Sequence, residues 1–214
     1  MTPIPKDKIN TGKDLTTGIT GGIGSGKSVV SRVLRCNGFK VFDCDMEAKM
    51  LMTQNELLKK SLQEALGKDI YHEDGTLNRQ RLSDLIFTDE EKRKIVNREV
   101  HAAVSDLIMQ RRKETEGLFF IESAILASSG LLEFCDAVWL VVSDEKIRLK
   151  RLEEREPGRA EEMKKRIETQ KAEQYLLKHD MLEVLVNNVE SRLLERILKL
   201  IDKFKQTQTY TIPC

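Results

Sequence analysis

Residues 20–28 read TGGIGSGKS and follow a short β-branched run, LTTGIT, at residues 15–20. Four glycines in six residues exclude a regular helix or strand interior, because glycine destabilises both. The spacing Gly21-x-x-x-x-Gly26-Lys27-Ser28, between a strand pattern and a helix pattern, is typical of a phosphate-binding loop. Such glycines allow positive φ angles and leave no Cβ in the way of a phosphate. The stretch predicts nucleoside triphosphate binding; the alternative is a chance glycine-rich turn before a lysine.

Individual roles follow from this loop pattern. We expect Lys27 to reach the β- and γ-phosphates and the Ser28 hydroxyl to ligate Mg²⁺, whereas Val29 can offer only its backbone N–H. The predicted nucleotide-binding residues of the loop are Gly22, Gly24, Ser25, Gly26, Lys27, Ser28 and Val29. The motif alone does not say what happens to the γ-phosphate.

The rest of the chain alternates strand and helix patterns. Besides residues 15–20, four short apolar runs read as strands: FKVFDCD at 39–45, GLFFIES at 117–123, AVWLVVS at 137–143 and EVLVNN at 183–188. Helical periodicity follows the loop at residues 27–37 and returns at residues 190–204, ESRLLERILKLIDKF. Apolar strands that alternate with helices favour a parallel α/β sheet covered on both faces.

Two connections, at residues 46–116 and 144–180, are much longer than a plain strand-to-strand crossover needs. Both follow the ends of strands, where α/β proteins bind ligands. We therefore predict a five-stranded parallel α/β core of the phosphate-loop kinase type with two helical blocks. The predicted parts are a flexible N-terminal arm at 1–14, a core at 15–45, 117–143 and 181–206, a helical substrate domain at 46–116 and a helical lid at 144–180.

Two acids, Asp43 and Asp45, end the second predicted strand. In a strand they would point the same way, beside the phosphate loop, where a carboxylate can accept the proton of an acceptor hydroxyl. The alternative is that Asp45 is the N-cap of the following helix, which would explain Asp45 well and Asp43 poorly.

The lid block contains five arginines: Arg148, Arg151, Arg155, Arg159 and Arg166. The first three share one helical face and can neutralise phosphate charge, as kinase lids do. The alternative is a solvated helix with Glu–Arg pairs, which Glu153, Glu154 and Glu156 make credible. A further acid, Glu122, ends the third predicted strand, where it could serve a metal shell.

Composition restricts the partners. The chain has 36 basic and 35 acidic residues, so its formal charge of +1 gives no general reason to bind nucleic acid or membrane. Its four cysteines form no CxxC pair, and neither a signal peptide nor a membrane-length apolar run is present. We expect a cytoplasmic protein with reduced thiols and small-molecule substrates, monomeric or weakly self-associating.

These residues together resemble the dephospho-CoA kinase family, which phosphorylates the 3′-hydroxyl of dephospho-coenzyme A in the last step of coenzyme A synthesis. The similarity runs from about residue 17 to residue 204. GITGGIGSGKS is close to the family's GLTGGIGSGKS, and GFKVFDCD stands where the family has Gly-x-x-Val-Ile-Asp-Ala-Asp. DGTLNRQRLSDLIFTD, RLKRLEER, RIETQ and VNN resemble further family segments.

The resemblance implies roles for single residues. It implies that Asp45 is the base that orients the 3′-hydroxyl, with Asp43 beside it, and that Arg79 and His101 lie on the coenzyme A side. It implies ATP and Mg²⁺ as cofactors, Arg151 and Arg155 as lid arginines, and Asn187 or Asn188 near the adenine. Departures include Ala102 for a family proline and ESAILASSG for a Pro-Leu-Leu-Phe-Glu segment.

Two other functions remain open at this point. The first is phosphorylation of another small molecule, such as a nucleoside monophosphate. The second is a nucleotide-dependent switch that acts through a partner, which would leave Asp43 and Asp45 without a role.

Overall fold

The computed structural model describes residues 14–159, 161, 163–165, 167–168, 182–189 and 191–209. Nearly all of the expected N-terminal arm, Arg166 and much of the expected lid lie outside the described residues. The chain divides into two compact units, the first formed by Met1–Phe42 with Glu114–Cys214 and the second by Asp43–Lys113.

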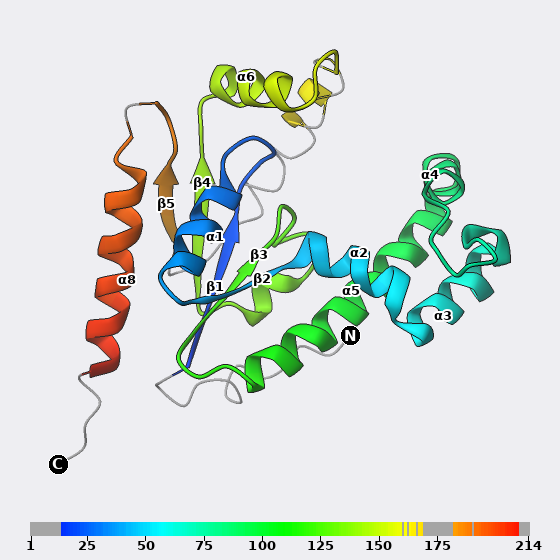
Figure 1. Ribbon diagram of the computed structural model, residues 1–214, viewed down its shortest axis with the longest axis horizontal. Helices are drawn as coiled ribbons and strands as arrows, with labels where there is room; N and C mark the ends of the chain where they lie inside the picture. The colour runs from blue at the N-terminus through cyan, green and yellow to red at the C-terminus, as the bar shows by residue number, and fades with distance from the viewer. Residues whose placement is uncertain are drawn as a thin grey trace. The chain divides into compact units, whose positions relative to one another are not determined.

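A five-stranded sheet forms the first unit, in the order β2-β3-β1-β4-β5 (Figure 1). Its strands are β1 (Leu15–Thr20), β2 (Lys40–Asp43), β3 (Leu118–Glu122), β4 (Ala137–Val142) and β5 (Leu182–Val186). Strand β1 lies at the centre and pairs in parallel with β3 and β4, and β4 pairs in parallel with β5. The parallel five-stranded α/β core is confirmed.

The core of this unit packs the sheet against two helices, α1 (Lys27–Cys36) and α8 (Leu193–Thr209), and α8 lies along β5 (Figure 1). Every residue of β3 is buried, as expected for a strand covered on both faces. Trp139 is fully buried, with its ring 5.4 Å from that of Phe120 and 6.2 Å from that of Phe204. The first helix of the expected lid block is α6 (Glu145–Arg155).

The second unit is helical and contains α2 (Cys44–Gln54), α3 (Glu56–Leu66), α4 (Arg79–Thr88) and α5 (Glu90–Lys113). Helices α2, α3 and α4 each pack on α5, which buries Val96, Val100, Val104 and Ile108 at a spacing of four residues. The long helical insertion between the second and third strands is therefore present. Among the described residues, no helix has the length and apolar character needed to cross a bilayer.

The second strand is shorter than its sequence pattern indicates. We expected a strand over residues 39–45, but β2 ends at Asp43 and α2 begins at Cys44. The Asp43 carboxylate accepts a 3.0 Å hydrogen bond from the backbone N–H of Met46 and is the N-cap of α2. The alternative in which Asp45 is the N-cap is wrong, and so is the strand alternation that placed both acids on one face: Asp43 supplies the first-turn acceptor that ends the strand.

Candidate active site

The glycine-rich loop lies between β1 and α1, at the end of the central strand. Gly24 and Gly26 have φ angles of 76° and 98°, a left-handed region that strongly favours glycine. Gly26 is also the N-cap of α1 and provides no side chain to bond its first-turn amides. The helix therefore begins with backbone N–H groups that no side-chain cap occupies, a favourable environment for an anion.

Side chains donate hydrogen bonds to the carbonyl groups of this loop, one from the loop itself and the others from distant parts of the chain. The Lys27 ammonium donates to the Gly21 carbonyl at 2.8 Å. Arg148 Nε donates to the Ile23 carbonyl at 2.8 Å, Arg151 Nη1 to the Gly24 carbonyl at 3.3 Å and Asn187 Nδ2 to the Ser25 carbonyl at 2.8 Å. We call Arg148, Arg151 and Asn187 the loop clamp.

The loop clamp sets the direction of the loop's backbone dipoles. In a trans peptide, the C=O of one residue and the N–H of the next point to opposite sides. Because the carbonyls of Ile23 and Ser25 face the clamp, the N–H groups of Gly24 and Gly26 face the other side. That arrangement is an anion-binding concavity.

The side chains of the loop occupy different environments. Ser28 is exposed, and its hydroxyl makes no hydrogen bond within the described ranges. Val29 is also exposed, but its amide already donates to the Gly26 carbonyl at 3.0 Å, so a phosphate would have to share that donor. The Ser25 hydroxyl is buried without a hydrogen-bond partner among the described residues.

The three arginines on one face of α6 do not behave alike. Arg148 and Arg151 reach the loop, and Arg151 Nη2 also donates to the Asn187 carbonyl at 3.0 Å. The Arg155 side chain is 59 % exposed and pairs with Glu156 at 3.2 Å, which is the solvated ion pair expected as the alternative. Arg159 also pairs with Glu156, at 2.8 Å.

The residues at the ends of β4 and β5 connect α6 to the sheet. Asn188 Oδ1 accepts from the Ser143 hydroxyl at 3.2 Å and from the Asp144 amide at 3.0 Å. The Ser143 hydroxyl also donates to the Asn187 carbonyl at 2.9 Å. Both predicted asparagines therefore have structural contacts here, and they hold the start of α6 against the sheet edge that carries the loop. The acid Glu122 lies at the same edge, since it pairs in register with Ile19 of β1.

The second unit carries the residues expected on the acceptor side. Asp45 lies in the first turn of α2, is exposed, and makes no hydrogen bond or ion pair within the part of the chain described. Arg79 is the first residue of α4 and is exposed, and His101 is half-buried on α5. Burial lowers the pKa of His101. No contact joins these three side chains in the described structure.

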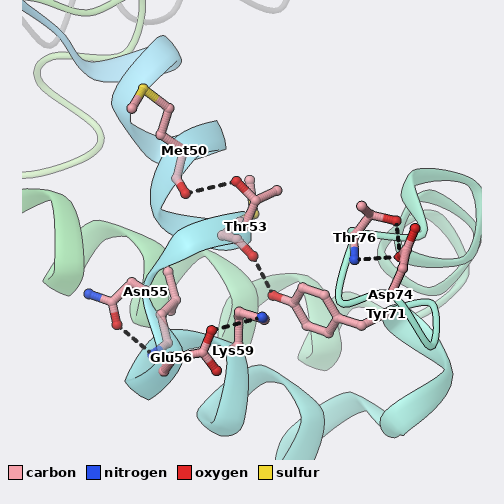
Figure 2. Close-up of polar contacts among 10 residues, drawn as sticks. Met50, Thr53, Asn55, Glu56, Lys59, Tyr71, Asp74 and Thr76 are labelled. Atoms are coloured by element: carbon pink, nitrogen blue, oxygen red, sulfur yellow. Dashed lines mark hydrogen bonds and ion pairs between the residues drawn. The ribbon is translucent and has the colours of Figure 1, made fainter.

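Polar contacts at the α2–α3 junction brace this unit (Figure 2). The Tyr71 hydroxyl donates to the Met52 carbonyl at 2.7 Å, and the Lys59 ammonium lies 5.7 Å from the centre of the Tyr71 ring. The Asn55 side chain accepts from the Leu58 amide at 3.0 Å and caps α3. A groove of about 440 Å³ lies between α2, α3 and α5, lined by leucines and alanines together with Asn55, Glu99 and Asp106.

The sequence did not reveal two of the contacts that hold the loop in this site. Arg148 and Asn187 hold loop carbonyls, although they stand 125 and 162 residues away from their partners. Their pairing with Ile23 and Ser25 depends on which strand ends meet at the sheet edge. A helical spacing of arginines points to a shared face but does not show which of them turns toward the loop.

A clamped glycine loop that joins the central strand of a parallel sheet to a helix defines a phosphate-loop nucleotide-binding protein of the α/β class. A family model described as dephospho-CoA kinase matches residues 15–192. The chain belongs to the dephospho-CoA kinase family.

Relatives of known name agree with this assignment. The dephospho-CoA kinase of Porphyromonas gingivalis is 40% identical over 189 residues, covering 88% of this chain and 93% of that protein. That of Fusobacterium nucleatum is 32% identical over 195 residues, covering 89% of this chain and 96% of that protein.

Solved structures support the same fold. The crystal structure of TT1252 from Thermus thermophilus superposes with a TM-score of 0.76 at 31% identity, covering 89% of this chain and 97% of that one. The dephospho-CoA kinase from Campylobacter jejuni superposes with a TM-score of 0.65 at 22% identity, covering 89% of this chain and 97% of that one. A similarity at this level of identity supports the fold only.

Proposed function

We propose that this protein transfers the γ-phosphoryl group of ATP to the 3′-hydroxyl of dephospho-coenzyme A. The observation that carries the proposal is the clamped loop Gly21–Ser28, in a chain whose family match spans residues 15–192. The loop supplies the amides and the lysine that a triphosphate requires. Membership of the family supports the choice of acceptor.

Lys27 and Ser28 would act on the triphosphate. Lys27 would exchange its bond to the Gly21 carbonyl for the β- and γ-phosphate oxygens, which offer a charge-assisted partner. The exposed Ser28 hydroxyl fits a ligand of Mg²⁺, and the described residues contain no cluster of three or more His, Cys, Asp or Glu side chains that could hold a metal by themselves. This favours an ion shared with the substrate phosphates, where it would neutralise charge on them.

Asp45 would accept the proton of the acceptor hydroxyl and orient its oxygen in line with the γ-phosphorus. Its carboxylate suits this role better than that of Asp43, because Asp43 is engaged as the cap of α2. We assign the second unit, with Arg79 and His101, to the dephospho-coenzyme A side; Arg79 is exposed and able to meet the diphosphate.

The lid residues would close the site on the nucleotide side. Arg151 is next to the loop and would offset charge that develops on the transferred phosphoryl group. Arg155 is at the exposed end of α6 and would have to leave Glu156 to contact ATP. Asn187 would lie near the adenine. Exclusion of water by this block would suppress ATP hydrolysis.

We also propose that the reaction takes place in the cytoplasm, with a monomer or weak homo-oligomer as the working form and no nucleic-acid partner. The exposed, free thiol of Cys36 is compatible with a reducing compartment.

The test is a turnover assay with Mg²⁺-ATP and dephospho-coenzyme A on wild-type protein and the variant Asp45→Asn. We expect Asp45→Asn to lower kcat by about 10²–10⁴-fold, the usual contribution of a general base, while ATP affinity stays near the wild-type value. Glu47→Gln is the matched control, because it removes the same charge from the same first turn of α2.

The assay also distinguishes the other candidates. Preference for a nucleoside monophosphate or another hydroxyl compound over dephospho-coenzyme A would replace the proposed acceptor. Full turnover by a folded Asp45→Asn protein would remove Asp45 from the role of base. Slow ATP hydrolysis without phosphorylation of any acceptor would favour a nucleotide-dependent switch.

A further inference from the structure

One residue of the loop clamp, Arg148, is buried far more deeply than its chemistry favours. Only 6% of the residue is exposed, and long charged side chains are rarely this buried unless they are paired. Its side-chain hydrogen bond goes to the Ile23 carbonyl, at 2.8 Å from Nε, rather than to a carboxylate. Burial lowers the pKa of Arg148, and the Glu145 carboxylate opposes this shift. The protein bears a desolvation cost at this position.

The guanidinium group lies directly against the backbone of the loop. A Cβ atom built on Gly22 would overlap Nη2 and would lie 2.8 Å from Cζ of Arg148. Nη2 itself is buried and has no hydrogen-bond partner within the described ranges. The side chain therefore places a buried positive charge and an unused donor against the Gly22–Ile23 segment.

The rest of this contact is apolar and comes from the same helix. Leu152 lies one turn after Arg148, and a Cβ on Gly24 would lie 3.2 Å from its Cγ. Leu152 also belongs to a buried cluster with Met163 and Ile167, against which Ile23 and Leu149 pack. The helix that carries Arg148 is thus packed against the loop, so the hydrogen bond from Arg148 to Ile23 has little freedom to shift.

We propose that Arg148 is a positioning residue for ATP binding, acting through the loop rather than through the acceptor. Its bond to the Ile23 carbonyl keeps the Gly24 amide turned toward the phosphates. Its buried charge also adds to the attraction for the triphosphate, because charges away from water are weakly screened. The inference rests on ATP being the phosphoryl donor of the proposed function.

This role predicts an effect confined to the nucleotide. We expect Arg148→Met to raise the Kd for ATP and the KM for ATP by tenfold or more, since a hydrogen bond from a charged group and its charge are both lost. The KM for dephospho-coenzyme A should stay within twofold of the wild-type value. Arg148→Lys keeps the charge and one donor, and its Kd should lie between those of Arg148→Met and the wild type.

The experiment measures equilibrium binding of ATP and of a fluorescent ADP analogue, then both KM values and kcat. The matched control is Lys150→Met, which removes an exposed cation from the same helix. Thermal unfolding without ligand checks that the variants fold; if Arg148→Met does not fold, the comparison of Arg148→Lys with wild type decides.

The proposal is overturned by an Arg148→Met protein whose ATP Kd is within twofold of wild type, or by equal increases in both KM values. It is also overturned if Lys150→Met or Arg148→Lys weakens ATP binding as much as Arg148→Met does. If Arg148→Met does not fold, the proposal is overturned by an Arg148→Lys protein whose Kd for ATP equals that of wild type. Wild-type protein that binds ATP but does not phosphorylate dephospho-coenzyme A would refute the proposed acceptor and leave the binding test of Arg148 intact.

Discussion

At the residue scale, the lack of a side chain at Gly22 leaves the space that the Arg148 guanidinium occupies. Gly22 has no unusual φ angle, so its backbone conformation is open to alanine. An alanine side chain has no space there, however, because the Arg148 guanidinium occupies it. Its Nη1 lies 3.2 Å from the position that a Cβ on Gly22 would take. Both residues are buried, and a close-packed site has little room to relax.

We expect Gly22→Ala to weaken ATP binding about five- to a hundredfold, the equivalent of the ~1–3 kcal/mol that overpacking usually costs. The reason is that the added methyl group pushes Arg148 away from the Ile23 carbonyl. Equilibrium ATP binding measures the effect. A double-mutant cycle with Arg148→Ala provides the control, because Gly22→Ala should cost much less when the guanidinium is absent. Additive losses would show that the methyl group acts in some other way.

At the scale of elements, the start of α2 was decided by competition between two local patterns. The run FKVFDCD has the apolar character of a strand, but Asp43 also offers the carboxylate that begins a helix. The cap is satisfied within three residues of sequence, and it ends the strand at Asp43. Asp45 therefore lies in the first turn of α2, exposed and without a hydrogen bond or ion pair to any described residue.

The end of α2 depends on a longer contact. Its Met52 carbonyl is one of the last four of the helix and has no partner within α2. The Tyr71 hydroxyl supplies that partner, with Lys59 against its ring (Figure 2). Burial, with a smaller contribution from Glu56, raises the pKa of Tyr71 to about 12. The hydroxyl therefore keeps its proton in the folded protein at pH values where an unfolded tyrosine ionises.

We expect Tyr71→Phe to lower the free energy of unfolding by about 0.5–1.5 kcal/mol at pH 8, the usual net value of one hydrogen bond. In wild-type protein, a raised pKa gives stability that is fully present below about pH 10 and is lost as the pH rises toward 12. The difference between the two proteins should therefore shrink between pH 10 and 12. Urea unfolding at pH 8 and pH 11 measures it, and a constant difference would contradict the assigned pKa.

At the scale of the whole molecule, the residues proposed for the nucleotide and for the acceptor lie in different units. The first contains the sheet, the loop and the loop clamp, and the second contains Asp45, Arg79 and His101. The single tryptophan of the chain, Trp139, is buried in the first unit. Its fluorescence therefore reports on the unit that carries the nucleotide site.

We expect a non-hydrolysable ATP analogue at about 100 times its Kd to stabilise the Trp139-reported unfolding transition by ~2.7 kcal/mol, because it binds only the folded loop. Lys27→Met should lose most of this increment at the same analogue concentration, since its affinity falls. Denaturant titrations followed by tryptophan emission provide the measurement. An equal increment in wild type and Lys27→Met would show that the analogue binds elsewhere.

The amino-acid sequence by itself determined the parts whose contacts are local. The glycine spacing, the helix that starts at Lys27 and the five apolar strands all depend on residues close together in the chain, where backbone sterics and hydrophobic period act directly. It also determined the family, because the match extends over residues 15–192.

Only the tertiary structure decided how the loop is held. Parallel strand order brings the ends of β1, β4 and β5 to one edge of the sheet, so that Arg148 and Asn187 reach carbonyls 125 and 162 residues away. The tertiary structure also gave Arg148 and Arg155 different environments, although they share one helical face. Arg148 is buried under the loop, whereas Arg155 is exposed. Helical spacing fixes the face on which a side chain lies, but its partner depends on which distant backbone the sheet places opposite.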